Sequence, residues 1–312
     1  MPPTPAKPPL ASRLWRYQQE RFPLAAFVPL ISVFTFSSAA YSRVARGESG
    51  FIPWSRFAAG ALTALTFFFV LRVLDEHKDQ DIDRRARPEL PVPRGLVTLG
   101  ELRRVAAAAL AGAILLNALL APVLLIPMAL VALWAALMTR EFFVREWLRA
   151  HPSAYLLTHM AIMPLIDGYT TGLDWLVEGR EAPPGLVLFL AVTFLNGMVI
   201  EVGRKVRAPE SERDGVDTYT HAWGLRVAPA VWIALLVGSG ATALAALRHV
   251  GATMLVAPLA ACVLAGAAPA AWFLAHPVAR AARSVEAASQ LWPLATYLML
   301  GALPYLERLG SS

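Results

Sequence analysis

Residues 74–88 read Leu-Asp-Glu-His-Lys-Asp-Gln-Asp-Ile-Asp-Arg-Arg-Ala-Arg-Pro and carry five acidic side chains. They follow directly on residues 58–74, an apolar run that a single arginine interrupts. If a helix continues through both stretches, Asp75, Asp79 and Asp83 are four residues apart and lie on one face. Because like charges at this spacing repel, we expect a positive partner, and a hard divalent cation such as Mg²⁺ suits carboxylate oxygens.

Arginines are the other candidates for that partner. Arg72 and Glu76 lie beside the acidic row, and four further arginines follow it: Arg84, Arg85, Arg87 and Arg94. One alternative is therefore a solvated loop at a membrane surface whose acids pair with these arginines. A calcium loop does not fit, because Arg84 stands where the sharp turn needs glycine and Leu90 where a bidentate glutamate belongs.

The composition indicates a polytopic membrane protein. The chain has 312 residues, of which 57% are hydrophobic and only 16% charged. The net charge of +6 comes from basic residues placed between apolar runs, so it indicates membrane loops and no nucleic-acid partner. A single cysteine, Cys262, excludes an intrachain disulfide and a cysteine-based metal cluster.

We expect an all-α integral membrane protein with about nine transmembrane helices around a central cavity. A helix needs about 20 mostly apolar residues to cross a bilayer. The candidate spans are residues 23–41, 58–74, 105–120, 123–138, 153–171, 186–200, 227–247, 253–276 and 287–306.

The domain prediction is a disordered N-terminal tail at residues 1–22 and one transmembrane domain at 23–312. Most of the 28 lysines and arginines fall on the side of the N-terminus. The positive-inside rule therefore predicts a multi-pass protein of the cell membrane with a cytoplasmic N-terminus. The same rule places the charged loops 75–95 and 201–224 in the cytoplasm.

Loop 201–224 follows the sixth predicted span as loop 75–95 follows the second. Two charged blocks at one membrane face can meet above a central apolar chamber and form a site for a polar headgroup. Glu201, Arg204 and Lys205 open the second block. For Glu201 a structural alternative stays open, namely ion pairs with Arg204 and Lys205 at helical spacing.

The first block resembles a known motif. Asp75-Glu76-x-x-Asp79-x-x-x-Asp83, followed by Arg-Pro at 87–88 and Pro-x-Gly at 93–95, is similar to the first Asp-rich motif of UbiA-type membrane prenyltransferases. That family shows Asn-Asp-x-x-Asp-x-x-x-Asp, so Asp75 replaces the asparagine. The nine-helix layout and the motif positions after helices two and six are similar as well.

The resemblance implies an Mg²⁺-dependent enzyme in which two Asp-rich motifs bind a polyprenyl (isoprenoid) diphosphate. Ionisation gives an allylic cation, which a hydrophobic acceptor attacks. The expected metal ligands are Asp75, Glu76, Asp79, Asp83 and Glu201. The expected catalytic residues are Asp79, Asp83, Arg204 and Lys205. The expected diphosphate contacts are Arg72, Lys78, Arg87, Arg94, Arg204, Lys205, Arg207 and Tyr219.

The second motif departs from the family pattern. Residues 215–219 match its Gly-x-x-Thr segment, but the positions expected for aspartates hold Arg207 and Ser211. Nearby acids, Glu210, Glu212 and Asp214, are out of register. Diphosphate carries about three negative charges, which metals or a cationic clamp can neutralise. Our hypothesis is that the first motif holds Mg²⁺ while Arg204, Lys205 and Arg207 hold the departing diphosphate.

Other functions remain open at this stage. A terpene cyclase of the same fold would let the chain's own double bond attack the cation. A membrane transporter would use the intramembrane residues Asp167 and His159, and a scaffold would need no chemistry. The spans also carry Asn117 and Asn196, which we expect to bridge helices.

Overall fold

The computed structural model describes residues 8–213 and 216–311, which form helices and loops without a strand among them. The α-helices are α1 (Leu10–Arg21), α2 (Leu24–Ala45), α3 (Trp54–Lys78), α4 (Gln80–Ala86), α5 (Leu99–Leu120), α6 (Leu125–Thr139), α7 (Arg145–Ala150), α8 (Pro152–Met160), α9 (Ile162–Gly172), α10 (Leu186–Gly203), α11 (Tyr219–Trp223), α12 (Val227–His249), α13 (Val256–Ala275), α14 (Ala279–Tyr297) and α15 (Leu303–Ser311). Short 3-10 turns are η1 (Pro122–Leu124), η2 (Glu141–Phe143), η3 (Pro209–Ser211) and η4 (Thr253–Leu255), and η5 (Leu298–Ala302) is a π-helical segment.

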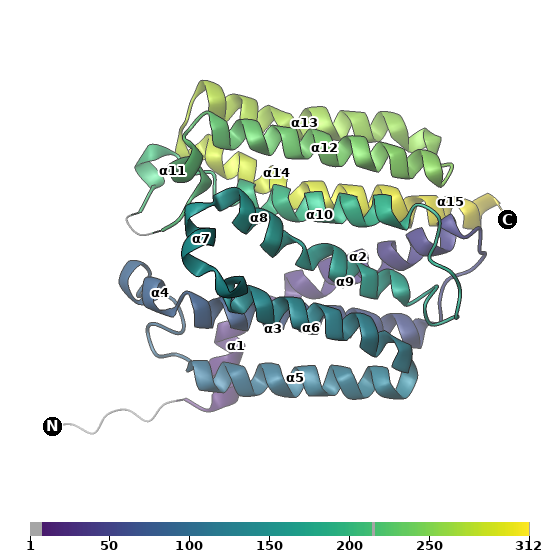
Figure 1. Ribbon diagram of the computed structural model, residues 1–312, viewed down its shortest axis with the longest axis horizontal. Coiled ribbons are helices and arrows are strands. Elements are labelled where there is room, and N and C mark those ends of the chain that lie inside the picture. Colours follow the sequence, from purple (N-terminus) through teal and green to yellow (C-terminus); the bar gives the residue numbers. More distant parts are fainter. Residues whose placement is uncertain (1–7, 214–215, 312) are drawn as a thin grey trace.

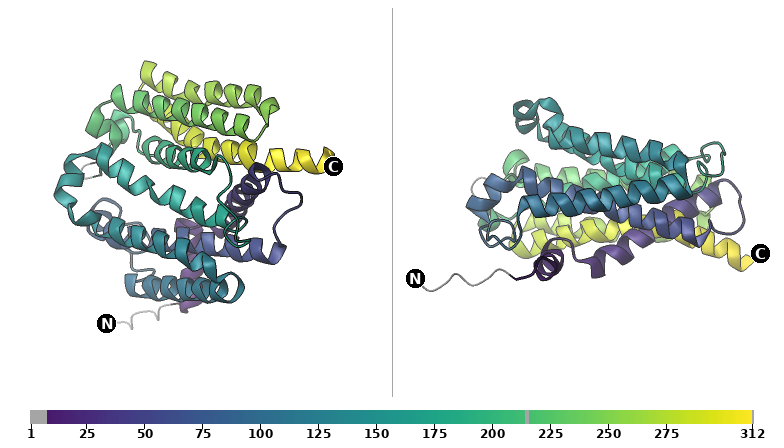
Figure 2. Two further views of the ribbon diagram at one scale, coloured as in Figure 1. Left: turned by 45° about the vertical axis from the view of Figure 1, so that its right-hand side comes forward. Right: turned by 90° about the horizontal axis from the view of Figure 1, so that it is seen from below.

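The long helices form a bundle and run along a common axis (Figure 1). The short helices α4, α7 and α11 gather at one end of it, and the C-terminus lies at the other end. Helix α1 runs crosswise to the bundle, as both views in Figure 2 show. Both charged blocks of the sequence therefore lie at the same end of the molecule, which we call the charged end.

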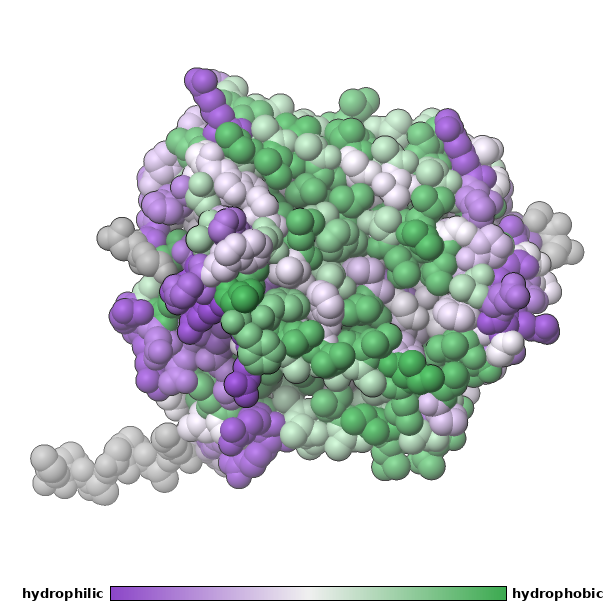
Figure 3. Space-filling model, in the orientation of Figure 1, coloured by the Kyte–Doolittle hydropathy of each residue, from purple (hydrophilic) through white to green (hydrophobic). Residues whose placement is uncertain are grey.

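The surface between the two ends is apolar. In Figure 3 a wide hydrophobic belt separates polar residues at the two ends. Large aliphatic side chains in this belt face outward, with Leu119 74% exposed and Val187 79% exposed. Lipid can cover such side chains, whereas in water they would expose a large apolar area to solvent. The protein is an all-α integral membrane protein.

Seven helices of the described part are long and apolar enough to cross a membrane. They correspond to seven of the nine predicted spans: 24–45, 54–78, 99–120, 122–139, 186–203, 227–249 and 253–275. Predicted span 153–171 is divided into α8 and α9, which meet at Ala161 just before Pro164. Predicted span 287–306 covers most of α14, the segment η5 and the start of α15. The count of nine stays a prediction.

Two apolar cores hold the bundle together. The first lies among α10, α12, α13 and α14 and contains Trp232, which is completely buried. The second lies among α3, α6 and α9. Helix α2 packs against α3 and α9 of one group and against α14 and η5 of the other, so it joins the two halves. In that contact Gly301 of η5 approaches Ser37 so closely that a Cβ at 301 would overlap the Ser37 backbone.

Buried amides link neighbouring helices, as the sequence predicts. Asn117 donates a 2.8 Å hydrogen bond to Thr63 and accepts one of 2.9 Å from Tyr169. Asn196 donates to Thr296 at 2.8 Å and accepts from Ser239 at 2.9 Å. In an apolar surrounding these bonds satisfy polar groups and fix the order of the helices. The prediction that the two asparagines bridge helices is confirmed.

The structure corrects the predicted disordered tail for Leu10–Arg21, which form α1; residues 1–7 lie outside the described residues. Helix α1 buries Tyr17 against α3 and α5, and Arg13 forms a 2.6 Å ion pair with Glu101. The proline-rich composition before residue 10 led to the prediction of disorder. The helix itself depends on partners that are distant in the sequence. Leu10 and Trp15 stay exposed on it and suit an interfacial position.

Candidate active site

Two lysines from the two charged blocks meet at one aromatic ring. The chain has three lysines, and Lys7 lies outside the described residues. The ammonium of Lys78 lies 4.8 Å from the centroid of the Tyr155 ring, and that of Lys205 lies 5.5 Å from the same centroid. Lys205 also lies 5.7 Å from the centroid of the Tyr219 ring. The blocks thus come together through α8, which carries Tyr155.

Lys78 ends α3 and is held by side chains from two other segments. Its ammonium lies 2.5 Å from a carboxylate oxygen of Glu141, donates to the Tyr155 hydroxyl at 2.9 Å and lies 3.5 Å from Nε2 of His159. Glu141 begins η2, where Glu141, Phe142 and Phe143 all have positive φ, between 48° and 61°. Non-glycine residues are strained in this region, and such strain persists only where the surroundings enforce it.

Glu141 is a site residue that the sequence analysis missed. Its position in a short segment after α6 carries no motif, and its pairing with Lys78 spans more than 60 residues of chain. One of its carboxylate oxygens, Oε2, forms no hydrogen bond with the described residues although it is buried. Positive φ at three consecutive residues is visible only in three dimensions.

The second block forms the other half of this cluster. Glu201, buried at the end of α10, accepts from Arg204 through one carboxylate oxygen at 2.5 Å and pairs with Lys205 through the other at 2.8 Å. This is the structural alternative that the sequence left open for Glu201. Attraction to Glu201 raises the pKa of the Arg204 guanidinium further above its ordinary value. Arg204 also interacts electrostatically with Asp75, which belongs to the first block.

We call these residues the central polar cluster; its members are Asp75, Lys78, Glu141, Tyr155, His159, Glu201, Arg204, Lys205 and Tyr219. Asp75 keeps its side chain accessible, with 55% of its surface exposed. It also lines a cavity of about 20 Å³ among α3, α6 and α8. Its lining combines Asp75, Lys78 and His159 with Leu71 and Met138. Charged groups and apolar side chains therefore meet at its wall.

The remaining acids of the first motif have different surroundings. Glu76 is buried and pairs with Arg21 of α1 at 2.6 Å, so it holds α1 to α3. Asp83 is buried and lies 3.4 Å from Arg87, and burial raises the pKa of its carboxyl above the ordinary value. Asp79 lies between α3 and α4, interacts electrostatically with Asp75 and Asp83, and accepts no side-chain hydrogen bond from the described residues.

A preformed metal site is absent from the described part of the chain: no three His, Cys, Asp or Glu side chains are arranged to hold an ion. Asp75 and Asp79 nevertheless fit Mg²⁺ as a pair, because Mg²⁺ takes one or two carboxylates and fills its shell with water and substrate phosphates. Among the described residues Asp75 forms one long ion pair, of 3.9 Å with Arg72, and accepts no side-chain hydrogen bond, so its oxygens are available. Glu201 does not fit a metal, since both its oxygens already bind cations.

Three predicted diphosphate contacts lie elsewhere at the charged end. Arg94 pairs with Glu20 at 2.6 Å, which raises the pKa of the guanidinium and lowers that of the carboxyl. Arg207 pairs with Glu286 at 3.1 Å and, together with Arg87, lines a separate cavity. The structure thus brings Arg204 and Lys205 to the first motif but not Arg207.

Thr218 and Tyr219 belong to the second-motif match and lie at the start of α11. Thr218 caps α11 by accepting from the backbone N–H of His221, and its hydroxyl donates to Glu212 at 2.8 Å. Tyr219, next in sequence, packs under Lys205; its hydroxyl is buried without a hydrogen bond to the described residues, and burial raises its pKa. Asp214 and Gly215, which belong to the matched segment, lie outside the described residues.

Asp167, the intramembrane acid, lies in the interior away from the cluster. It accepts hydrogen bonds from Ser38 of α2 at 2.9 Å, from Thr170 at 3.3 Å and from Tyr297 of α14. It is only 3% exposed. These contacts join α9 to two other helices, which is a structural role.

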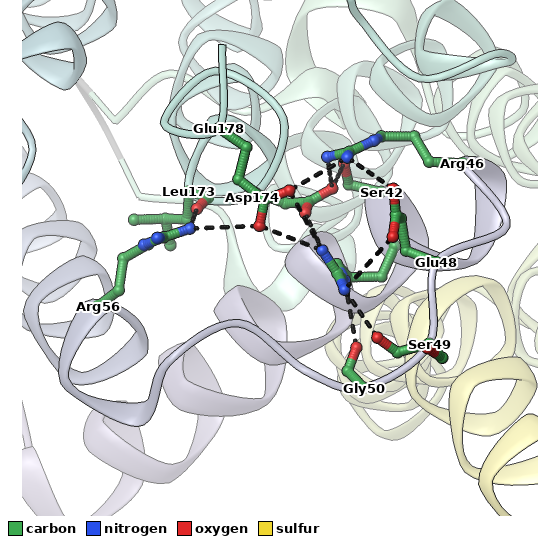
Figure 4. Close-up of polar contacts among 10 residues, drawn as sticks. Ser42, Arg46, Glu48, Ser49, Gly50, Arg56, Leu173, Asp174 and Glu178 are labelled. Carbon is green, nitrogen blue, oxygen red and sulfur yellow. Dashed lines mark hydrogen bonds and ion pairs between the residues drawn. The ribbon is translucent and has the colours of Figure 1, made fainter. Parts of the chain in front are cut away.

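A second polar network lies at the end of the bundle opposite the charged end (Figure 4). Asp174 is completely buried; it pairs with Arg43 at 3.1 Å and with Arg46 at 2.9 Å and accepts from Ser42 at 2.6 Å. Glu178 also pairs with Arg43 and Arg46. Every charged side chain drawn in Figure 4 has a partner of opposite charge, so the network stabilises the contact between α2 and the segment after α9.

The fold and the site together define a helical membrane protein with a charged cluster at one end of its bundle. No protein-family model and no curated protein sequence matches the chain. A solved structure described as digeranylgeranylglyceryl phosphate synthase in membranes has the same fold, with a TM-score of 0.65 at 14% sequence identity. The match covers 94% of this chain and 99% of that one, so the two helical arrangements are similar over their whole lengths.

Proposed function

We propose that the protein is an intramembrane prenyltransferase of UbiA type, which ionises an isoprenoid diphosphate and transfers the prenyl group to an acceptor. The observation that supports this most strongly is the meeting of Lys78 and Lys205 at the Tyr155 ring, since it joins the two charged blocks into one site. The similarity in fold to a digeranylgeranylglyceryl phosphate synthase in membranes agrees with this proposal.

The cations of the central polar cluster are suited to a departing diphosphate. Lys78, Arg204 and Lys205 each already pair with a carboxylate, which places them in advance of substrate binding. Their ammonium and guanidinium groups donate to phosphate oxygens, and this stabilises the charge that develops as the leaving group departs. Preorganised donors cost little reorganisation during the reaction.

The first motif supplies the carboxylates for Mg²⁺. Asp75 and Asp79 would hold it together with the diphosphate, and the buried Asp83 interacts electrostatically with Asp79. When bound, Mg²⁺ neutralises charge on the diphosphate and so makes it a better leaving group. At the second motif, Arg204 and Lys205 take the place of a further metal ion.

In the reaction the bond between C1 of the prenyl chain and the diphosphate oxygen breaks, and its electron pair leaves with the diphosphate. An electron pair of the acceptor forms the new bond to C1, and the acceptor then loses a proton. The apolar side chains of α3 and α6 line the path below the cluster, and they must move apart to admit a chain, since the cavity there measures about 20 Å³. A dry wall around the allylic cation protects it from water.

We also propose that the charged end faces the cytoplasm, because most lysines and arginines lie on that side. A cytoplasmic headgroup site with apolar side chains below it would receive the charged head of the substrate from water and its prenyl chain from the membrane.

The test is an assay of the purified protein in nanodiscs with prenyl diphosphates of several lengths, with and without Mg²⁺. The proposal predicts Mg²⁺-dependent release of pyrophosphate and a prenylated product when a lipid acceptor is present. A cyclic hydrocarbon formed without any acceptor would assign the terpene cyclase alternative instead. If no substrate yields pyrophosphate, the proposal fails.

A further inference from the structure

A second cavity at the charged end is lined mainly by arginines. It measures about 320 Å³ and is open to the surface. The arginines come from three separate segments: Arg87 follows α4, Arg207 and Arg213 lie between α10 and α11, and Arg283 lies in the second turn of α14. Ser211 and Thr218 add hydroxyl groups to the wall. We propose that this cavity binds a phosphate-bearing group.

Two of the four arginines of the cavity are available to an anion. Arg87 is paired with Asp83 at 3.4 Å and Arg207 with Glu286 at 3.1 Å. Within the described part of the chain, Arg213 forms no ion pair or hydrogen bond through its side chain, and the same holds for Arg283. Two guanidinium groups of the lining are therefore free of carboxylate partners among the described residues, and they can donate to a phosphate, which as a monoester carries a charge of about −1.5 to −2.

Two glutamates near the cavity accept hydrogen bonds from other groups. Glu210 accepts a 2.8 Å hydrogen bond from the backbone N–H of Ala279, at the start of α14. Glu212 accepts from the hydroxyls of Thr218 and Thr220, each at 2.8 Å. These bonds stabilise the wall of the cavity and hold both carboxylates on partners other than its arginines.

The geometry suits phosphate better than a carboxylate or a metal. A guanidinium group donates two parallel hydrogen bonds to phosphate oxygens, and several of them around one cavity can surround a tetrahedral anion. A volume of about 320 Å³ is at the lower end of ligand sites and accepts a headgroup-sized molecule. Because the cavity is separate from the central polar cluster, it can be filled while a diphosphate occupies the cluster.

The phosphate can come from the headgroup of a lipid or from inorganic phosphate in solution. The test measures binding to full-length protein in phosphatidylcholine nanodiscs, with calorimetry for inorganic phosphate and native mass spectrometry for added phosphatidic acid. The variants are Arg213→Gln and Arg283→Gln. Arg280→Gln is the matched control, since Arg280 lies on the same helix as Arg283, is exposed and does not line the cavity.

We expect each cavity variant to weaken binding about tenfold relative to the wild type and to Arg280→Gln, as the loss of a charge-assisted hydrogen bond implies. A loss seen with both probes assigns the site to phosphate itself, and a loss confined to phosphatidic acid assigns it to a lipid headgroup. Equal binding by all four proteins, or binding of neither probe, would overturn the proposal. No turnover is needed, so the result is independent of prenyl transfer.

Discussion

Lys78 at the end of α3 donates a 2.9 Å hydrogen bond to the hydroxyl of Tyr155 on α8. The same ring faces Lys205 of the second block, so one side chain orients both lysines. A cation over an aromatic face gains about 0.5–2 kcal/mol, and more where water is excluded.

Replacement of that ring should therefore weaken substrate binding in two stages. Tyr155→Phe removes the hydrogen bond to Lys78 but keeps the aromatic face, and we expect a few-fold increase in KM for a prenyl diphosphate. Tyr155→Leu removes both, and we expect an increase of about tenfold or more. Steady-state kinetics of pyrophosphate release measures this difference, and equal KM values for the two variants would contradict the role given to the ring.

The carboxylate of Asp79 should be needed for turnover but not for folding. Asp79→Asn should lower kcat by about 10²–10³, because in the proposed reaction this carboxylate would hold the Mg²⁺ that neutralises the leaving group. Asp81→Asn is the control: Asp81 belongs to the same acidic stretch but is exposed. Kinetics at saturating Mg²⁺, together with thermal unfolding, distinguish the two; a normal rate for Asp79→Asn would remove this residue from the site.

The pair formed by Glu76 and Arg21 should stabilise the attachment of α1. Glu76 is buried, so Arg21→Ala leaves its charge without a partner and should cost about 3–5 kcal/mol in that region. Limited proteolysis should then cut α1 faster than in the wild type. Arg16→Ala, which changes an exposed arginine of the same helix, should not change the cleavage rate. Equal rates for both variants would show that the pair does not hold α1.

The close contact between Gly301 and α2 leaves no room for a side chain at position 301. A Cβ at 301 would lie 1.9 Å from the backbone oxygen of Ser37, so Gly301→Ala must displace α2 or η5. We expect a loss of thermal stability in detergent. Gly112→Ala is the matched control, since nothing lies within 4 Å of a Cβ there and alanine favours a helix by about 1 kcal/mol. A Gly301→Ala protein with the same melting temperature as the wild type would contradict this contact.

The network around Asp174 should affect stability and leave chemistry intact. Asp174→Asn removes a completely buried charge between Arg43 and Arg46, and breaking a buried pair costs about 3–5 kcal/mol. The network lies at the opposite end from the central polar cluster (Figures 1 and 4), so the protein that stays folded should keep its kcat. A strong loss of kcat at unchanged melting temperature would place a functional site there.

The helical membrane fold could be predicted from the sequence because apolar runs of bilayer length are a local signal. The boundaries at 153–171 and 287–306 could not be predicted, since Pro164 and the π-helical segment η5 interrupt the runs. Helix α1 was missed for a different reason: it depends on distant partners such as Glu76 and Glu101.

The sequence predicted which residues gather at the candidate site better than it predicted how they pair. The structure brings Asp75, Lys78, Arg204 and Lys205 together, as the two-block layout indicates. Spacing along a helix says nothing about which side chains a neighbouring segment supplies. The ion pair of Glu141 with Lys78 and the turn of Arg207 toward Glu286 therefore emerge only from the fold.

The central claim is that both lysines act on one departing diphosphate. The most direct measurement compares single-turnover release of pyrophosphate from the prenyl diphosphate that the wild type turns over fastest. The proteins are the wild type, Lys78→Gln, Lys205→Gln and the double variant, with Arg280→Gln as control and unfolding curves for each protein. We predict a fall of about 10²-fold or more for each single variant. For the double variant we expect a fall no larger than the product of the two single effects. A larger fall would mean that the double variant has unfolded. Wild-type release matched by the folded double variant, or no release by the wild type, would contradict the claim.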